Sequence, residues 1–263
     1  MKLGQAMAGR SGGLAETLAA PTAHRLDVEQ HALFMRFREH PYGCVVAFDE
    51  APAEEAEFPD RRARLGEPLF LHAGYNAICA VRVGEASGRV GGADETLADV
   101  LNGLADSGAL DAFRPLLGVG LGRGADAALS FADRLGFEDV LAIGPVAGPG
   151  SDWSARARLG PVSRLVIGWD PEDRHVSGAV GSLMARTPSA TRVTALPTPG
   201  LGPDLSAAIR RRGLWTSLVT GFLAGGPNPS LFRRRLAADA AGRSNGRPSH
   251  GAAGPALGLV RAH

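Results

Sequence analysis

The chain has 263 residues, of which 44% are hydrophobic and 21% are charged, and its 28 basic residues nearly balance 27 acidic ones. A chain of this length can bury the core of one large α/β domain, and its apolar fraction excludes a wholly disordered protein. The 36 glycines and 18 prolines follow no three-residue period, which excludes collagen, and a net charge of +1 gives no global reason to expect nucleic acid or an acidic membrane as partner.

The N-terminal residues 1–26 are expected to form a flexible segment that leads into the fold. The first twenty of them are rich in glycine and alanine and lack the continuous apolar stretch of a signal peptide. No run in the sequence approaches the roughly 18 apolar residues that a membrane-spanning helix needs. These features predict a soluble, cytoplasmic protein with no membrane span.

Helices and strands are predicted to alternate after this segment. The spread of apolar residues over 28–37 predicts a helix that ends near a proline, and the apolar run 42–48 predicts a buried strand. Residues 50–66, first acidic and then basic, are expected to form a solvated loop or a short helix. The pattern then predicts strands at 77–83, 114–121, 139–143, 164–169 and 191–196, and helices at 96–104, 125–135, 177–185, 205–212 and 214–223.

This alternation defines the fold class. Short apolar strands separated by helices predict an α/β protein with a mostly parallel, doubly wound sheet and helices on both faces. We assign it to a single domain over residues 27–223. Cys44 and Cys79 lie within two of the predicted strands, where we expect buried thiols and no disulfide.

Residues 224–263 differ in composition from the domain. They contain six arginines and one acidic residue, so a net charge of +5 in this tail offsets −4 in the rest of the chain. The tail is rich in Gly, Pro, Ser and Ala, and we expect disorder apart from one short helix that residues 232–241 can form. A basic tail can bind nucleic acid or acidic lipid, but the cluster Arg233-Arg234-Arg235 is short and has no interleaved aromatic residues, so we expect a solvated tail and not a binding tail.

A glycine-rich turn between a predicted strand and a predicted helix is the most informative stretch, and it reads LGVGLGRGA over residues 117–125. The spacing Gly120-x-Gly122-x-x-Ala125 fits a dinucleotide-binding turn, in which glycines let the backbone approach a pyrophosphate at a helix N-terminus. However, the next predicted strand has no acid placed for a ribose, and the turn does not follow the first strand. A dinucleotide-binding oxidoreductase is therefore our third hypothesis.

The same residues have the spacing of a nucleophile elbow, G-x-S-x-G, which presents a serine on a sharp strand-to-helix turn. Residues 120–124 read GLGRG, and a helix with small residues follows. Together with a strand that ends in Phe48-Asp49 and a later one that ends in Trp169-Asp170, this order of elements resembles the α/β-hydrolase superfamily over residues 42–223. The resemblance implies an α/β-hydrolase fold and hydrolysis of an ester or related acyl bond.

The chain departs from this superfamily at two of its three catalytic positions. The serine position falls on Gly122, which has no side chain to form an acyl-enzyme. The acid position fits Asp170 or Asp173, but no histidine follows the last predicted strand, and His175 is expected to be an exposed loop residue. With Glu172 these residues are interpreted as a solvated turn and not as a metal site. We expect the catalytic positions to be vestigial and the protein to be a pseudoenzyme.

The candidate ligand site consists of Gly120, Gly122, Arg123 and Gly124. Arg123 places a cation beside a helix N-terminus, where backbone N–H groups favour anions, and this predicts a small anionic ligand that is bound without cleavage. The leading hypothesis is a degenerate α/β-hydrolase-like protein that serves as a binding or scaffold protein. The alternative is a serine-type hydrolase of ester or related acyl bonds with an unlocated nucleophile. No cofactor, metal or nucleic acid is expected, and the sequence gives no oligomeric state.

Overall fold

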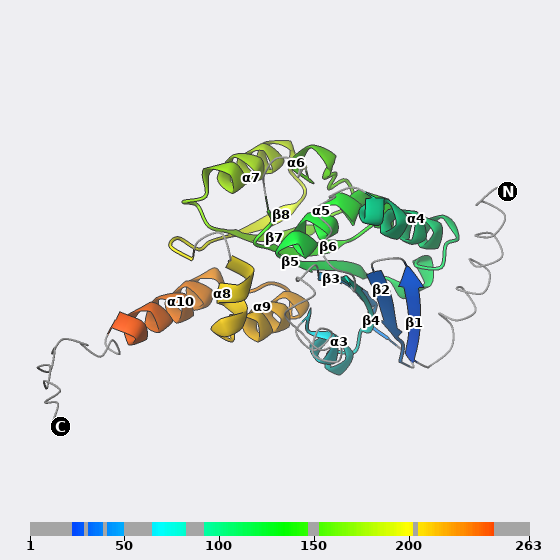
Figure 1. Cartoon of the computed structure of the whole chain (residues 1–263), viewed down its shortest axis with the longest axis horizontal. Coiled ribbons are helices and arrows are strands. Elements are labelled where there is room, and N and C mark those ends of the chain that lie inside the picture. The colour runs from blue at the N-terminus through cyan, green and yellow to red at the C-terminus, as the bar shows by residue number, and fades with distance from the viewer. Residues whose placement is uncertain are drawn as a thin grey trace, which may run out of the picture.

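The computed structural model describes residues 23–28, 31–38, 41–49, 65–82, 92–146, 153–201 and 205–244. Within this described part, one sheet contains eight strands in the order β1-β2-β4-β3-β5-β6-β7-β8 (Figure 1). The strands are β1 (Ala23–Val28), β2 (His31–Arg36), β3 (Cys44–Asp49), β4 (Asn76–Arg82), β5 (Leu116–Leu121), β6 (Asp139–Ile143), β7 (Arg164–Trp169) and β8 (Arg192–Pro197). The six strands from β3 to β8 run parallel, whereas β1 pairs antiparallel with β2, and β2 with β4. The predicted α/β class with a mostly parallel sheet is confirmed.

Helices cover both faces of the sheet, as predicted. One face carries the α4–α7 layer, which consists of α4 (Gly92–Asp106), α5 (Arg123–Leu135), α6 (Trp153–Arg156) and α7 (Arg174–Arg186). The other face carries the α8–α10 layer, which consists of α8 (Leu205–Arg211), α9 (Leu214–Leu223) and α10 (Pro229–Ser244), together with α3 (Glu67–His72). All of β5 is buried, with Leu116 in the first core and Leu117 in the second. A strand that is buried on both faces gives the continuous apolar run from which it is predicted.

The N-terminal part of the fold differs from its prediction. Residues 28–37 do not form the predicted helix; they lie mainly in β2, so that prediction is wrong. Leu33 packs in one core and Phe34 in the other, because β2 is buried on both faces. Such a strand places apolar residues at every position, including those with helical spacing. Strand β1 includes residues 23–26, the last residues of the segment 1–26 that was expected to be flexible. Residues 1–22 of that segment lie outside the described part.

The C-terminal tail contains a helix where the sequence predicts one. Helix α10 is longer at both ends than the short helix predicted at 232–241. Phe232 and Leu236 lie one helical turn apart, and both are buried in the core of the α8–α10 layer. These two apolar residues therefore dock the helix on the sheet. Residues 245–263 lie outside the described residues.

The remaining predicted elements are present with small shifts of their ends. The strands at 139–143 and 164–169 and the helix at 214–223 have the predicted bounds. Helices α3 and α6 were not expected, and residues 50–64 of the predicted solvated segment lie outside the described part. No helix among the described residues is long and apolar enough to span a bilayer.

Both cysteines are buried, as predicted, and they face opposite sides of the sheet. Cys44 lies in the core of the α4–α7 layer and Cys79 in the core of the α8–α10 layer. In the parallel pair β3–β4, Cys44 is opposite Asn76 and Cys79 is opposite Ala47, so the two thiols are also offset along the strands. Burial raises the pKa of the Cys44 thiol well above its usual range, which keeps it protonated.

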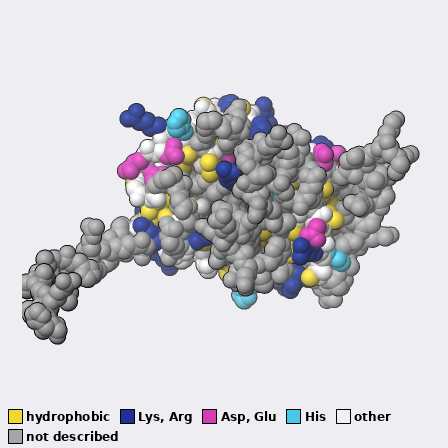
Figure 2. Space-filling view, in the orientation of Figure 1, with side chains coloured by type: hydrophobic (Ala, Val, Ile, Leu, Met, Phe, Trp, Pro, Cys, Tyr) yellow, Lys and Arg dark blue, Asp and Glu magenta, His cyan; other side chains and the backbone are white. Residues whose placement is uncertain are grey.

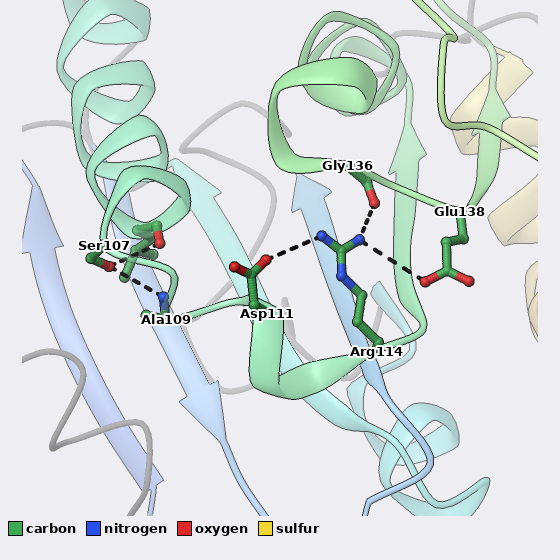
Figure 3. A network of polar contacts seen from close by, with 7 residues as sticks. Ser107, Ala109, Asp111, Arg114, Gly136 and Glu138 are labelled. Carbon is green, nitrogen blue, oxygen red and sulfur yellow. Dashed lines mark hydrogen bonds and ion pairs between the residues drawn. The ribbon is translucent and has the colours of Figure 1, made fainter.

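The start of β5 is fixed to the end of α5 by Arg114 (Figure 3). The guanidinium donates a hydrogen bond to the Gly136 carbonyl, and it lies 3.3 Å from the Asp111 carboxylate and 4.0 Å from that of Glu138. Gly136 is the C-cap of α5, so the cation meets the end of the helix where carbonyl groups lack helical partners. This contact holds the β5–α5 unit at the end opposite the glycine-rich turn.

Candidate functional site

The turn that leaves β5 lies where the strand order of the sheet reverses direction. From β3 the chain continues to β4 on one side of the sheet, whereas β5 and the strands after it lie on the other side. Open α/β sheets bind ligands at such a switch point, outside the carboxyl ends of their strands. The last residues of β3 and β5, Asp49 and Leu121, are register partners at this place. The topology therefore favours the glycine-rich turn as the candidate site.

Gly122 makes the sharp turn between β5 and α5. Its φ of 64° and ψ of −130° lie in a backbone region that is open to glycine and strained for other residues. The Gly122 N–H donates to the Ile143 carbonyl at 2.8 Å, and the Gly122 carbonyl accepts from the Ala125 N–H at 2.9 Å. The strand–turn–helix arrangement predicted from the glycine spacing is present, and a glycine occupies the position that a nucleophile elbow gives to serine.

Gly120 and Gly124 let α5 pack closely on β5. A Cβ atom on Gly120 would lie 2.1 Å from the Gly124 carbonyl oxygen and 2.6 Å from the Ala125 Cα, so only glycine fits there. Gly124 is itself buried. The absence of a side chain at Gly120 is thus explained by packing. The ligand contact predicted for both glycines stays a prediction.

Ser206 is the side chain that lies beside the elbow, and the sequence analysis did not identify it. A Cβ atom on Gly122 would lie 3.3 Å from the Ser206 Oγ, and one on Gly144, which follows β6, would lie 3.5 Å from the Ser206 backbone nitrogen. The first turn of α8 therefore lies over the ends of β5 and β6. The sequence signal for Ser206 was weak: it is a serine at the start of α8, the helix that follows the last strand, β8.

The predicted acidic turn is divided by the structure into residues with different roles. Asp170, directly after β7, is 4% exposed, and its Oδ1 accepts from the Glu172 N–H at 2.9 Å. Asp173 is the N-cap of α7, where its carboxylate accepts from the backbone N–H groups of His175 at 3.0 Å and Val176 at 3.1 Å. The His175 side chain is exposed, as expected. Only Asp170 combines burial with a position at a strand end.

The loop after β8 is held to β7 through Thr198. The Thr198 side chain is fully buried, and both its hydroxyl and its backbone N–H donate to the Trp169 carbonyl, at 2.9 and 2.8 Å. In the described part of this loop no histidine follows Thr198. Apart from His175, the described histidines lie in β1, in β2 and at the end of α3. The carboxyl edge of the parallel strands thus offers a buried carboxylate and a serine hydroxyl, and its described imidazole, that of His175 in the first turn of α7, is exposed.

Arg123 is the first residue of α5 and is exposed. The first N–H groups of a helix have no helical acceptor, and the helix dipole makes this end positive. Asp126, in the same first turn, uses its carboxylate to accept the Val146 N–H at 2.9 Å, which fastens the segment after β6 to α5. Arg123 and the backbone beside it are therefore suited to meet an anionic or carbonyl oxygen.

Metal-binding groups are not assembled around this edge. Among the residues that the structure describes, no three His, Cys, Asp or Glu side chains come close enough together to hold a metal ion. The turn at Gly122 follows the third of the parallel strands, whereas a dinucleotide-binding turn follows the first.

Comparisons with known proteins identify the fold. No family model and no curated protein matches the sequence. Among solved structures, an arylesterase is similar with a TM-score of 0.51 and 11% identity, over 81% of this chain and 90% of that one. The esterase Pf2001 from Pyrococcus furiosus is similar with a TM-score of 0.52 and 13% identity, over 81% of this chain and 93% of that one. The fold is that of the α/β hydrolases, as the resemblance implied, and at such identities the likeness concerns the fold alone.

Proposed function

We propose that this protein binds an ester-type or carboxylate ligand at the carboxyl edge of its sheet and forms no covalent intermediate at Gly122. The observation that carries the proposal is the elbow itself, which has the backbone turn of a hydrolase but no side chain at its centre. Acyl transfer by a serine enzyme needs a nucleophile that a neighbouring base activates. The ligand class is proposed by analogy with the esterases that share the fold.

Three groups of this chain are placed to hold such a ligand. The backbone N–H groups at the start of α5 can donate to a carbonyl or carboxylate oxygen, as an oxyanion hole does. The Arg123 guanidinium adds a positive charge at the same helix end. The Ser206 hydroxyl, beside the elbow, can donate a further hydrogen bond. Binding needs these donors, and it needs neither a nucleophile nor a base.

Ester hydrolysis is the second candidate function, and the comparisons favour it over binding alone. Both reported structural neighbours are described as esterases. Ser206 gives this function a candidate hydroxyl, since its Oγ lies 3.3 Å from where the Cβ of an elbow serine would stand. The Ser206 hydroxyl would attack the acyl carbon and lose its proton to a base, the ester C–O bond would break and release the alcohol, and water would hydrolyse the acyl-serine to the acid. Asp170, a buried carboxylate directly after β7, is the candidate base.

The two functions are separated by a hydrolysis assay with 4-nitrophenyl butyrate and a fluorophosphonate probe. We expect neither turnover nor labelling above a heat-denatured sample. Turnover and labelling that both disappear in Ser206→Ala would overturn the binding proposal and establish Ser206 as the nucleophile.

Binding itself is measured by calorimetric titration with butyrate and with phenyl phosphate as hydrolysis-resistant anionic probes. We expect Arg123→Gln to weaken binding about tenfold, which corresponds to one charge-assisted hydrogen bond. Arg174→Gln, at the exposed first position of α7, is the matched control and should leave binding unchanged. Equal affinity in the wild type and Arg123→Gln would exclude Arg123 from the site.

A further inference from the structure

The α8–α10 layer carries a concentration of positive charge that the candidate site does not use. Residues 205–244 contain seven arginines and a single acidic residue, Asp239. Two runs of three consecutive arginines contribute six of the seven: residues 210–212 at the end of α8 and residues 233–235 within α10. Because both helices belong to the same layer, two clusters far apart in sequence lie on one side of the sheet (Figure 1).

Helix α10 is oriented by its two buried residues. Phe232 and Leu236 pack into the core, so the opposite side of the helix, centred on Arg234, faces solvent. Arg233 and Arg234 are exposed, and Leu231, beside Arg234 on this outward side, is 42% exposed. Basic side chains are visible in the region of α10 in the space-filling view (Figure 2). The exposed side chain of Leu231 therefore lies among arginine side chains on the outward side of α10.

The orientation of α10 is fixed at its start and along its length. The Asn228 side chain accepts from the Ser230 and Leu231 N–H groups, at 3.0 and 3.1 Å, and so caps the helix. The Arg235 guanidinium donates to the Ser217 hydroxyl of α9. These contacts present Leu231 and the neighbouring arginines on a rigid surface.

We propose that the outward face of α10, with its exposed arginines and Leu231, docks on an anionic phospholipid surface. Clustered arginines are attracted to the negative potential of such a surface, and an exposed leucine among them can enter the interface between headgroups and acyl chains. The outward face exposes no aromatic ring for base stacking, since Phe232, the aromatic residue of α10, is buried. The combination of cations with an aliphatic side chain favours lipid over nucleic acid. The proposal is independent of what the elbow binds.

The test is co-sedimentation of the full-length protein with phosphatidylcholine vesicles that contain phosphatidylserine, against vesicles of phosphatidylcholine alone. We expect binding to the first kind only, and weaker binding at higher salt because ions screen the attraction. The double variant Arg233→Gln/Arg234→Gln should lower the affinity by at least about tenfold, given the strength of single cation–surface interactions. Leu231→Ser, which changes no charge, should lower it by a smaller factor.

The matched control is Arg156→Gln/Arg174→Gln, which removes the same charge from exposed positions on the α4–α7 layer. This control should bind vesicles as the wild type does. Failure of the wild type to bind phosphatidylserine vesicles would overturn the proposal, and so would an equal loss in the control. Binding of a single-stranded oligonucleotide that depends on Arg233 and Arg234, with no binding to vesicles, would also overturn it and assign the surface to nucleic acid.

Discussion

The two layers of helices on the sheet differ in charge and in what they contribute to the candidate site. The helices of the α4–α7 layer hold five arginines and six acidic residues, whereas helices α8, α9 and α10 hold six arginines and one acidic residue. The first layer supplies α5, whose N-terminus forms half of the elbow, and the second supplies Ser206, which lies against it. Both layers bury a comparable apolar core, so burial does not account for the difference in charge. We infer that the α4–α7 layer builds the turn and that the α8–α10 layer presents groups to partners.

The largest expected effect on stability comes from placing a side chain between α5 and β5, where the two elements pack closely at Gly120. Gly120→Val would place a side chain 2.1 Å from the Gly124 carbonyl oxygen, and we expect it to lower the free energy of unfolding by more than about 3 kcal/mol. Urea denaturation followed by circular dichroism measures this loss. Gly181→Ala in α7, with open space around its Cβ, is the control and should stabilise the protein by about 0.5–1 kcal/mol. Similar effects of both variants would show that α5 does not pack as described.

The next largest effect is expected from removing the packing of α10 on the core of its layer. Phe232→Ala removes a buried aromatic ring, and we expect a loss of about 3 kcal/mol in the free energy of unfolding. Leu231→Ala, on the exposed side of the same helix, should change it by less than about 0.5 kcal/mol. Were the two variants equally stable in urea, α10 would not contribute to the core and the proposed docking surface would lose its rigid support.

A smaller effect is expected at the point where both layers meet, the elbow. Gly122→Ser places an L-residue at a φ of 64° and a ψ of −130°, with Ser206 close by, and should cost about 2 kcal/mol. Combining it with Ser206→Gly separates backbone strain from crowding in a double-mutant cycle. We expect Ser206→Gly to recover part of the loss. Strict additivity of the two substitutions would indicate that α8 does not press on the turn.

The smallest effect tests the role of the acidic turn. Asp173→Ala should lower the free energy of unfolding by about 1 kcal/mol, because it removes the N-cap of α7, and Asp173→Asn should retain most of the stability. Thermal denaturation of the three proteins checks this order. If Asp173→Asn were as unstable as Asp173→Ala, the carboxylate charge, and not the cap hydrogen bonds, would be the important feature.

The sequence predicted the parallel part of the fold because its strands are apolar on both faces and bounded by glycine, proline or charged residues. It failed at β2, where the same continuous burial matched helical spacing, and it predicted only residues 232–241 of α10, whose docking through Phe232 and Leu236 was concealed by an arginine run. In both cases the missing information is tertiary: neither the partner strand of β2 nor the core beneath α10 is visible in the local pattern.

Within the candidate site, the turn at Gly122 could be predicted from the sequence, whereas the approach of Ser206 to this turn could not. The glycine spacing around Gly122 constrains the local backbone strongly, so its strand–turn–helix geometry follows from the sequence. Ser206 reaches the elbow only because β8 and its loop bring the chain back across the sheet, and no motif marks such an approach. Asp173, which fitted the acid position as well as Asp170 did, is occupied as a helix cap, a role that depends on where α7 begins.

The placement of the two thiols has a practical consequence for measuring the stability of the sheet. Cys44 and Cys79 lie in separate cores on the adjacent central strands β3 and β4, so neither reacts with a thiol reagent, nor can the two be joined by an oxidant, unless these strands open. The rate at which each thiol is labelled therefore reports the free energy of opening at the centre of the fold. Cys44 reports from the side of the α4–α7 layer and Cys79 from the side of the α8–α10 layer. The native chain thus contains its own pair of opening probes without any engineered cysteine.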